Sequence, residues 1–212
     1  MTNPNRVIVL KPGEEIPNGF EDAEDVDVTS RAESPLSPFL IGGTHASDAN
    51  SQRPGTWFHN FENMWQYSKV YRVLGHVGED GMPSTEWYKW YEEGAERRQA
   101  VRYPAGRDAK PEYLMWQGRK LGYVTARKLV YIPKYMERVG ANPNAAAEFK
   151  RLYDILKRDN KLILRDFDCY PITRNYNWQA LVDDPYRRFG HGFVLAHALE
   201  HGSTRAYVRL IV

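Results

Sequence analysis

Three polar residues in the segment 61–71 have the types and the spacing that chemistry on a bound ligand requires. Glu62, Gln66 and Lys69 follow one another at intervals of four and three residues, so in a helix they share one face. Trp65 places an aromatic ring beside that row. A carboxylate, an amide and an amine in this arrangement can form the polar wall of an aromatic pocket. The alternative is that Glu62 and Lys69 are ordinary solvated charges on a helix surface.

A second candidate is the carboxylate pair Asp166 and Asp168, at the end of an apolar segment. Residues two apart on a strand point to the same side, and two close carboxylates move each other's pKa apart, so that one can act as a base at neutral pH. Such a pair can also hold a hydrated metal ion. The structural alternative is that one carboxylate caps a turn while Arg165 or Arg174 pairs with the other.

The late histidines and the single cysteine give weaker patterns. His197 and His201 have the i, i+4 spacing of zinc ligands on a helix, and His191 stands upstream. Glu200 adjoins the second histidine, so this is not the HExxH arrangement, and no third ligand is identifiable. Cys169 has no evident histidine partner and is an unpromising nucleophile.

Basic and aromatic residues alternate between Arg97 and Lys128, a composition that can grip phosphates and stack a base. The alternative is the cationic face of a balanced surface, because the whole chain has 29 Lys and Arg against 27 Asp and Glu. The residues concerned are Arg97, Arg98, Arg102, Arg107, Lys110, Arg119, Lys120, Arg127 and Lys128, with Tyr103, Tyr113, Trp116 and Tyr123.

Short strands and longer helices are expected to position these residues. Alternating or β-branched runs predict strands over residues 6–10, 25–29, 161–167 and 206–212. Helical spacing predicts helices over residues 57–75, 86–102, 123–139, 143–160 and 185–201. Pro133 should kink or split the third helix, and Gly75, Gly140 and Gly202 are expected to end helices. Residues 31–55, rich in Ser, Pro and Gly, predict a long loop that can fold over a pocket.

The composition limits the class of protein. A chain of 212 residues with 13% aromatic residues can fill one sizeable core, so a single globular domain over residues 1–212 is expected. Helices without regular βαβ spacing predict an α+β fold, mostly helical around a small sheet. One cysteine excludes an internal disulfide. No run approaches the roughly 20 apolar residues of a membrane span, and no signal segment is evident, so a cytoplasmic protein without a membrane anchor is expected.

Five segments, taken in order, resemble a bacterial and phage family and, more distantly, the NADAR family, the NAD- and ADP-ribose-associated N-glycosidases. The resemblance lies in the order of motifs, over most of the chain from residue 27. The segments are DVTSRAESPLSPF (27–39), FENMWQYSKVY (61–71), KLGYVTARKLVYIPKYMERV (120–139), LILRDFDCY (162–170) and FGHGFVLAHAL (189–199).

The resemblance also identifies site positions. In the NADAR family a helix with a Glu-His-x-x-Gln-x-x-Lys pattern lines the pocket, and Glu62, Gln66 and Lys69 are the counterparts here. Asn63 stands where the histidine is usual. The family's later lysine-containing helix resembles the segment around Lys134, and its acidic strand end resembles residues 164–168. Its closing Trp-Gly segment has no partner, since PYRRFGHGF contains no tryptophan.

What the resemblance implies is hydrolysis of the bond between a nitrogen and the anomeric carbon of ribose, in ADP-ribose adducts or phosphorylated ribosylamino compounds. The expected partner is a nucleotide-like small molecule or an ADP-ribosylated nucleic acid, and no cofactor or metal is expected. The implied roles are charge stabilisation by Glu62, phosphate binding by Lys69 and Arg119, base stacking by Trp65, further substrate contacts by Gln66 and Lys134, and orientation of water or ribose hydroxyls by Asp166 or Asp168.

Two other functions stay open. Residues 97–128 fit a non-catalytic protein that binds nucleotides or nucleic acid. Asp166, Asp168 and the late histidines fit a metal-assisted hydrolase.

Overall fold

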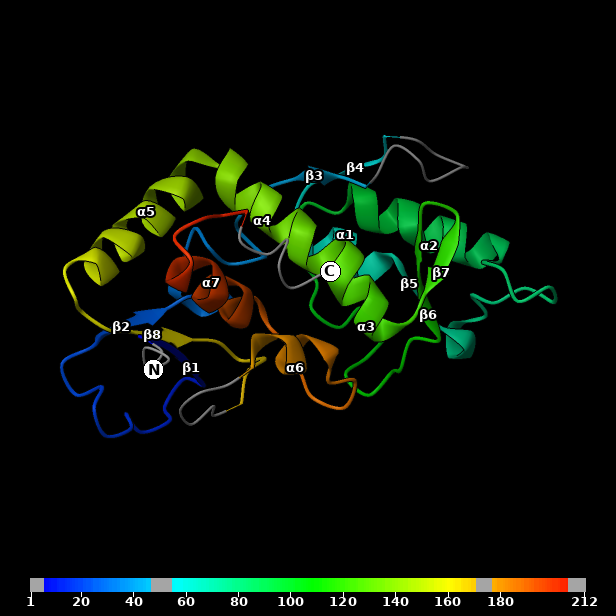
Figure 1. Cartoon of the computed structure of the whole chain (residues 1–212). Helices are drawn as coiled ribbons and strands as arrows, with labels where there is room; N and C mark the ends of the chain where they lie inside the picture. The colour runs from blue at the N-terminus through cyan, green and yellow to red at the C-terminus, as the bar shows by residue number, and fades with distance from the viewer. Residues whose placement is uncertain (1–5, 47–54, 171–176, 206–212) are drawn as a thin grey trace. The chain divides into compact units, whose positions relative to one another are not determined.

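The computed structural model describes residues 6–46, 55–170 and 177–205, which form an α+β fold with small sheets. Residue contacts divide the chain into two units. The first unit takes the chain up to Ile41 and again from Ile132, and the second unit is Gly42–Tyr131. Figure 1 labels the elements, and each unit is described by itself below.

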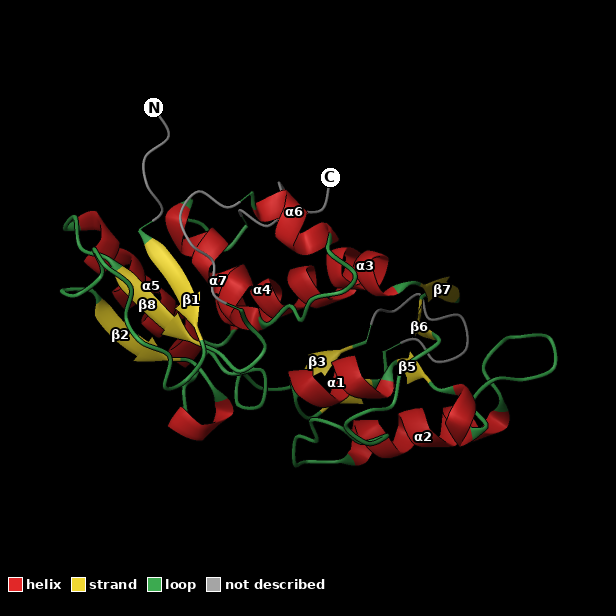
Figure 2. Cartoon of the chain, turned by 90° about the horizontal axis from the view of Figure 1, so that it is seen from below, coloured by secondary structure: helices red, strands yellow, loops and turns green. Residues whose placement is uncertain are grey.

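A three-stranded parallel sheet organises the first unit, with strand order β1-β8-β2 (Figures 1 and 2). Its strands are β1 (Val7–Leu10), β8 (Leu162–Arg165) and β2 (Glu24–Asp27). The expected strands at 6–10 and 161–167 are confirmed, and the one predicted at 25–29 begins one residue earlier and ends two residues earlier. The fourth expected strand, 206–212, lies outside the described residues.

Both faces of this sheet are covered. Neighbouring residues of a strand point to opposite faces, so β1 and β8 contribute side chains to both. On one face Ile8, Leu10 and Ile163 pack against Phe20 in the loop after β1. On the other face Val9 lies against the start of helix α7. Burial on both faces explains why β1 and β8 are continuous apolar runs.

Four helices complete the first unit: α4 (Ile132–Ala141), α5 (Pro143–Lys157), α6 (Trp178–Asp183) and α7 (His191–Glu200). The expected Asn-Pro start of α5 is confirmed, since the Asn142 side chain accepts hydrogen bonds from the backbone amides of Asn144 and Ala145 at 3.0 and 3.1 Å. Gly202, in the left-handed region at φ 65°, follows α7 as predicted.

Two helix boundaries in the first unit differ from the prediction. The last helix begins at His191, not near residue 185. In its first turn the backbone amide of Gly192 donates a hydrogen bond to the Asp166 carboxylate, which fixes the start of the helix there. Gly140 does not end a helix. It lies inside α4, and Asn142 follows directly as the cap of the next helix.

The described residues of the second unit form α-helices and two antiparallel sheets. Its helices are α1 (Phe61–Tyr67) and α2 (Thr85–Glu96), which pack on each other, and the single-turn helix α3 (Tyr123–Ala126). Strands β3 (Thr44–His45) and β4 (Trp57–Phe58) form a pair. Strands β5 (Lys69–Val70), β6 (Tyr113–Trp116) and β7 (Arg119–Leu121) form a sheet in that order.

The helix predicted over 57–75 is much shorter than expected. Asn60 caps α1, with its side chain accepting from the amide of Asn63 at 2.8 Å. At the other end the Ser68 hydroxyl donates to the Met64 carbonyl at 2.7 Å. Lys69 and Val70 then leave the helix and pair with β6. Helical spacing along one segment contains no information about this strand partner. The helix predicted over 86–102 likewise ends early, at Glu96.

The disturbance predicted at Pro133 is confirmed. Residues Arg127–Tyr131 form a π-helical segment, η3, that ends two residues before the proline. Proline lacks a backbone N–H and its ring excludes the carbonyl oxygen four residues earlier, so a wider turn relieves the clash. No helix within the described residues is both long and apolar enough to span a bilayer.

Candidate functional site

All seven residues of α1 are buried, so this helix is a central element of the second unit and not a surface helix. Glu62 is only 6% exposed, which excludes the alternative of a solvated carboxylate at this position. Burying a charged side chain is costly unless polar groups surround it. The helix therefore holds a carboxylate inside the unit, and polar partners must offset the free-energy cost of burying it.

Hydrogen bonds connect the three polar residues predicted from spacing. The Gln66 side-chain amide donates to the Glu62 carboxylate at 2.7 Å, and the Lys69 ammonium donates to the Gln66 carbonyl oxygen at 2.7 Å. Because lysine only donates and a carboxylate only accepts, these two partners fix the orientation of the Gln66 amide. The Lys69 ammonium also lies 5.0 Å from the ring centroid of Trp65.

A hollow of about 110 Å³ opens at the Lys69 end of this row. This is less than the roughly 150 Å³ of a cavity that holds one benzene molecule, so the hollow is somewhat smaller than one aromatic ring requires. Glu62 is not among the residues that line it and lies one helical turn away. The lining residues are Trp65, Lys69, Pro111, Glu112, Tyr113, Leu114, Tyr123 and Ala126.

Two other ionisable groups of the hollow, Glu112 and Tyr113, are already engaged. Glu112 accepts two hydrogen bonds from the Arg72 guanidinium at 2.5 and 2.7 Å, and this arginine lowers the pKa of Glu112 below its usual range. Burial raises the pKa of Tyr113, so this residue is a neutral phenol at physiological pH, and it donates to the Gly81 carbonyl at 2.9 Å. Glu112 is therefore an ionised carboxylate, and its charge is balanced by Arg72.

Asn63 makes hydrogen bonds that give it a structural role. Its side-chain amide donates to the carbonyls of Arg97 and Gln99 at 3.0 and 2.9 Å, and its carbonyl oxygen accepts from the amide of Val101 at 2.9 Å. This side chain attaches the segment after α2 to α1. Position 63 thus holds the surrounding chain in place.

Asp166 lies in the first unit and is only 1% exposed. Its carboxylate accepts from the amide of Gly192 in the first turn of α7 at 2.8 Å and from the amide of Asp168 at 3.2 Å, and it lies 3.3 Å from Nδ1 of His191. A carboxylate at a helix N-terminus is stabilised by the backbone amides there. These contacts give Asp166 a structural role, and its role in catalysis stays a prediction.

Asp168 is more accessible than Asp166, and a cation that lies beside it is not one of those predicted. Arg188 lies 3.6 Å from it. Arg165 instead forms a two-point contact with Asp25, at 2.6 and 2.8 Å. Arg174, the other predicted partner, lies outside the described residues. The prediction that one carboxylate of the pair supports a turn is confirmed by the hydrogen bond from the Asp168 amide to Asp166.

The structure brings together Glu62, Trp65, Gln66 and Lys69 in the second unit. Arg119 belongs to the same unit but is exposed on β7 and does not line the hollow. Lys134 lies in α4 of the first unit, where its ammonium is 3.0 Å from Glu137. Among the described residues no group of three or more His, Cys, Asp or Glu side chains is arranged to hold a metal ion. The described residues therefore give no metal-binding site to the hypothesis of a metal-assisted hydrolase.

Sequence reasoning named Tyr113 and Tyr123 only as members of the basic and aromatic segment, and it did not place them or Leu114 at the wall of the hollow. Tyr113 and Leu114 lie on the β6–β7 hairpin, whose turn residues Gln117 and Gly118 have φ of 51° and 69°. Glycine as the second of two turn residues between strand-like runs is a signal for such a turn, and it is strongest after Asn or Asp. YLMWQGRKL contains that signal.

Comparison of the chain with protein-family models, with curated proteins and with solved structures finds no match in any of the three.

Proposed function

We propose that this chain is an N-glycosidase-like hydrolase that cleaves the C–N bond of an ADP-ribosyl or phosphoribosyl-amine substrate. The observation that carries the proposal is the buried carboxylate of Glu62, linked through Gln66 to Lys69, which lies beside Trp65 at a hollow of about 110 Å³. The resemblance to the NADAR family in the order of motifs supports the same assignment, including a NADAR-like form of the α+β fold.

The chemistry requires few groups. As the C–N bond breaks, positive charge develops on the ribose, and a poorly hydrated carboxylate stabilises that charge. A water oxygen then bonds to the anomeric carbon, one water proton goes to the departing nitrogen, and the other stays on the new ribose hydroxyl. In the proposal Glu62 supplies the negative charge, Lys69 binds phosphate and Trp65 stacks on the base. Gln66 positions the side chains of Glu62 and Lys69 through its hydrogen bonds to both.

The test is the Glu62→Gln variant, which keeps the shape of the side chain and removes its charge. We expect kcat/KM for base release from an ADP-ribosylated or ribosylamino substrate to fall by about 100-fold or more, the usual loss when a group that stabilises developing charge is removed. Chromatography of the released base measures this. The matched control is Glu86→Gln, which removes an exposed glutamate of α2 that pairs with Lys89.

Urea unfolding establishes whether each variant is folded. If Glu62→Gln releases base at the parental rate, Glu62 has no part in the reaction. If the parental protein hydrolyses neither substrate class, the proposed activity is wrong.

A further inference from the structure

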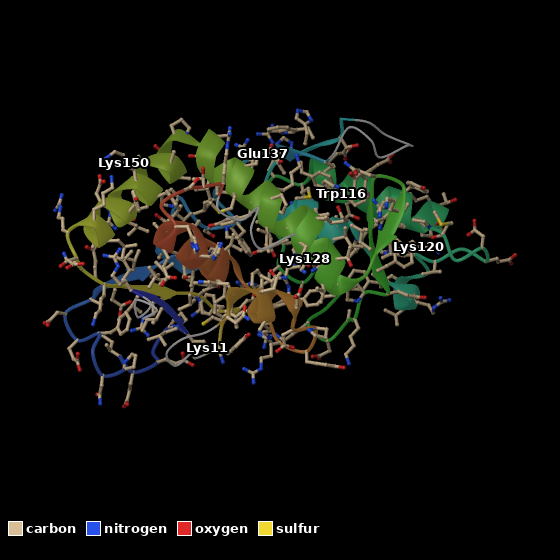
Figure 3. The ribbon with its side chains drawn as sticks, viewed as in Figure 1. Lys11, Trp116, Lys120, Lys128, Glu137 and Lys150 are labelled. Carbon is tan, nitrogen blue, oxygen red and sulfur yellow. The ribbon has the colours of Figure 1, made fainter. Side chains whose placement is uncertain are left out.

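Arg127 occupies an unusual position for a charged residue. It is only 1% exposed, although arginine is almost never fully buried unless it is paired. It lies in the π-helical segment η3, and π-helical turns occur frequently at functional sites. Burial is not a property of the whole segment, since the next residue, Lys128, labelled in Figure 3, is partly exposed. The side chain of Arg127 therefore belongs to the interior of the second unit.

The interior of the second unit also holds one buried acid. Among the described Lys, Arg, Asp and Glu residues of Gly42–Tyr131, the two that are buried are Glu62 and Arg127. Two opposite charges in one interior offset each other, whereas either charge alone would bear the full free-energy cost of leaving water. The charge balance of the interior therefore associates Arg127 with Glu62.

The far end of η3 lies against the start of α1. The ring centroid of Tyr131 is 5.4 Å from that of Phe61 and 4.9 Å from that of Trp65. Phe61 and Trp65 are four residues apart, so they share one face of α1, and Tyr131 contacts that face. Glu62 follows Phe61 directly and lies in the same first turn of the helix.

The segment that leads into η3 lies at the other end of α1. Tyr123 and Ala126 line the hollow together with Lys69, which follows α1. The segment from Tyr123 onward therefore runs antiparallel to α1. Arg127 comes between the two ends, and its guanidinium lies 4.5 Å from the centroid of the Tyr123 ring. This places Arg127 along the part of α1 that carries Glu62.

From this juxtaposition we infer that Arg127 forms an ion pair with Glu62 between η3 and α1, which keeps the buried carboxylate ionised and in position. Arginine suits this task because its guanidinium is always charged and donates hydrogen bonds from a rigid plane. Arg127 is a positioning residue, since it acts on a substrate only through Glu62. Its effect on the reaction rests on the proposed function, whereas the pairing itself does not.

Urea unfolding of a double-substitution cycle tests the pairing without any substrate. Arg127→Met should lower the folding equilibrium constant roughly 100-fold or more, because it leaves the Glu62 carboxylate buried without its cation. In the Glu62→Gln background the same substitution should cost about tenfold less, since no buried charge is left unpaired. The matched control combines Arg127→Met with Glu86→Gln, an exposed acid of the same unit, and these two effects should simply multiply.

The cycle gives a clear result even where one variant does not fold. If Arg127→Met alone is unfolded, the double variant with Glu62→Gln should recover folding, because the unpaired charge has been removed. A double variant that is no more stable than Arg127→Met alone overturns the inference. Effects of Arg127→Met and Glu62→Gln that multiply as those of the control pair do also overturn it.

Hydrolysis distinguishes a positioning role from a purely structural one. Arg127→Met should lower kcat for base release about 100-fold, as loss of the Glu62 charge does, and change KM less than about twofold, because Arg127 does not contact the substrate. Arg127→Lys keeps the charge and should restore kcat to within about tenfold of the parental value. A folded Arg127→Lys variant as slow as Arg127→Met contradicts the role of the charge. If the parental protein hydrolyses neither substrate class while the cycle shows coupling, the proposed function is wrong and the pairing stands.

Discussion

Cys169 is the single thiol of the chain, and its surroundings make it unreactive. It is buried, and its sulfur donates to the Asp166 carbonyl at 3.0 Å. Burial, with the nearby negative charge of Asp166, raises the pKa of Cys169 to about 12. Because the thiolate is the reactive form, a thiol of this pKa has about 1000-fold less thiolate at neutral pH than an ordinary cysteine.

We therefore expect native protein to resist a thiol-specific chromogenic reagent at about pH 8, while protein in concentrated guanidinium chloride reacts with one equivalent. The native rate should keep rising with pH beyond the point at which the unfolded rate levels off, because the raised pKa moves thiolate formation to higher pH. Rapid, stoichiometric labelling of the native protein would contradict the assigned surroundings of Cys169.

At the scale of elements, the close approach of α1 and α2 depends on Gly94. A β-carbon at this position would lie far inside the contact distance of the buried Tyr67 ring, against Cγ and Cβ, which a small side-chain movement cannot relieve. Gly140 in α4 is the opposite case, since a β-carbon there would meet only the Thr204 hydroxyl, at 3.8 Å. Both glycines lie in helices.

Gly94→Ala should therefore lower the free energy of unfolding by about 1–3 kcal/mol, and Gly140→Ala should raise it by about 0.5–1 kcal/mol through its better helix propensity. Urea unfolding followed by circular dichroism measures both changes. Equal effects of the two substitutions would show that helix propensity, not packing against Tyr67, governs Gly94.

The elements also show what the sequence could predict. Spacing correctly predicted that Glu62, Gln66 and Lys69 lie beside one another, because contacts between residues three and four apart depend on local geometry. It overestimated the length of the helix, since Lys69 leaves α1 to pair with Leu114, far along the chain. The surroundings of Asp166 were out of reach for the same reason, as its amide partner is Gly192. Contacts between distant segments leave little trace in local periodicity.

At the scale of the whole molecule, contacts concentrate within the two units, although a single globular domain was predicted. The first unit is discontinuous in sequence, and its sheet pairs β8 with two strands near the start of the chain. The second unit is one continuous segment. Dense contacts within a unit make its local unfolding cooperative. We therefore expect the backbone amides of the two units to exchange hydrogen with solvent at different rates.

Hydrogen exchange read by mass spectrometry tests this with one substitution in each unit. Gly94→Ala should speed exchange mainly in the described part of Gly42–Tyr131, because it disturbs the contact of α1 with α2. Gly192→Ala should speed exchange mainly in β1, β8 and α7, since its β-carbon would lie 2.9 Å from both Asp166 Cβ and Val9 Cγ1. If either substitution speeds exchange equally in both units, the chain opens as one cooperative domain, and the expectation of a single domain is the correct description.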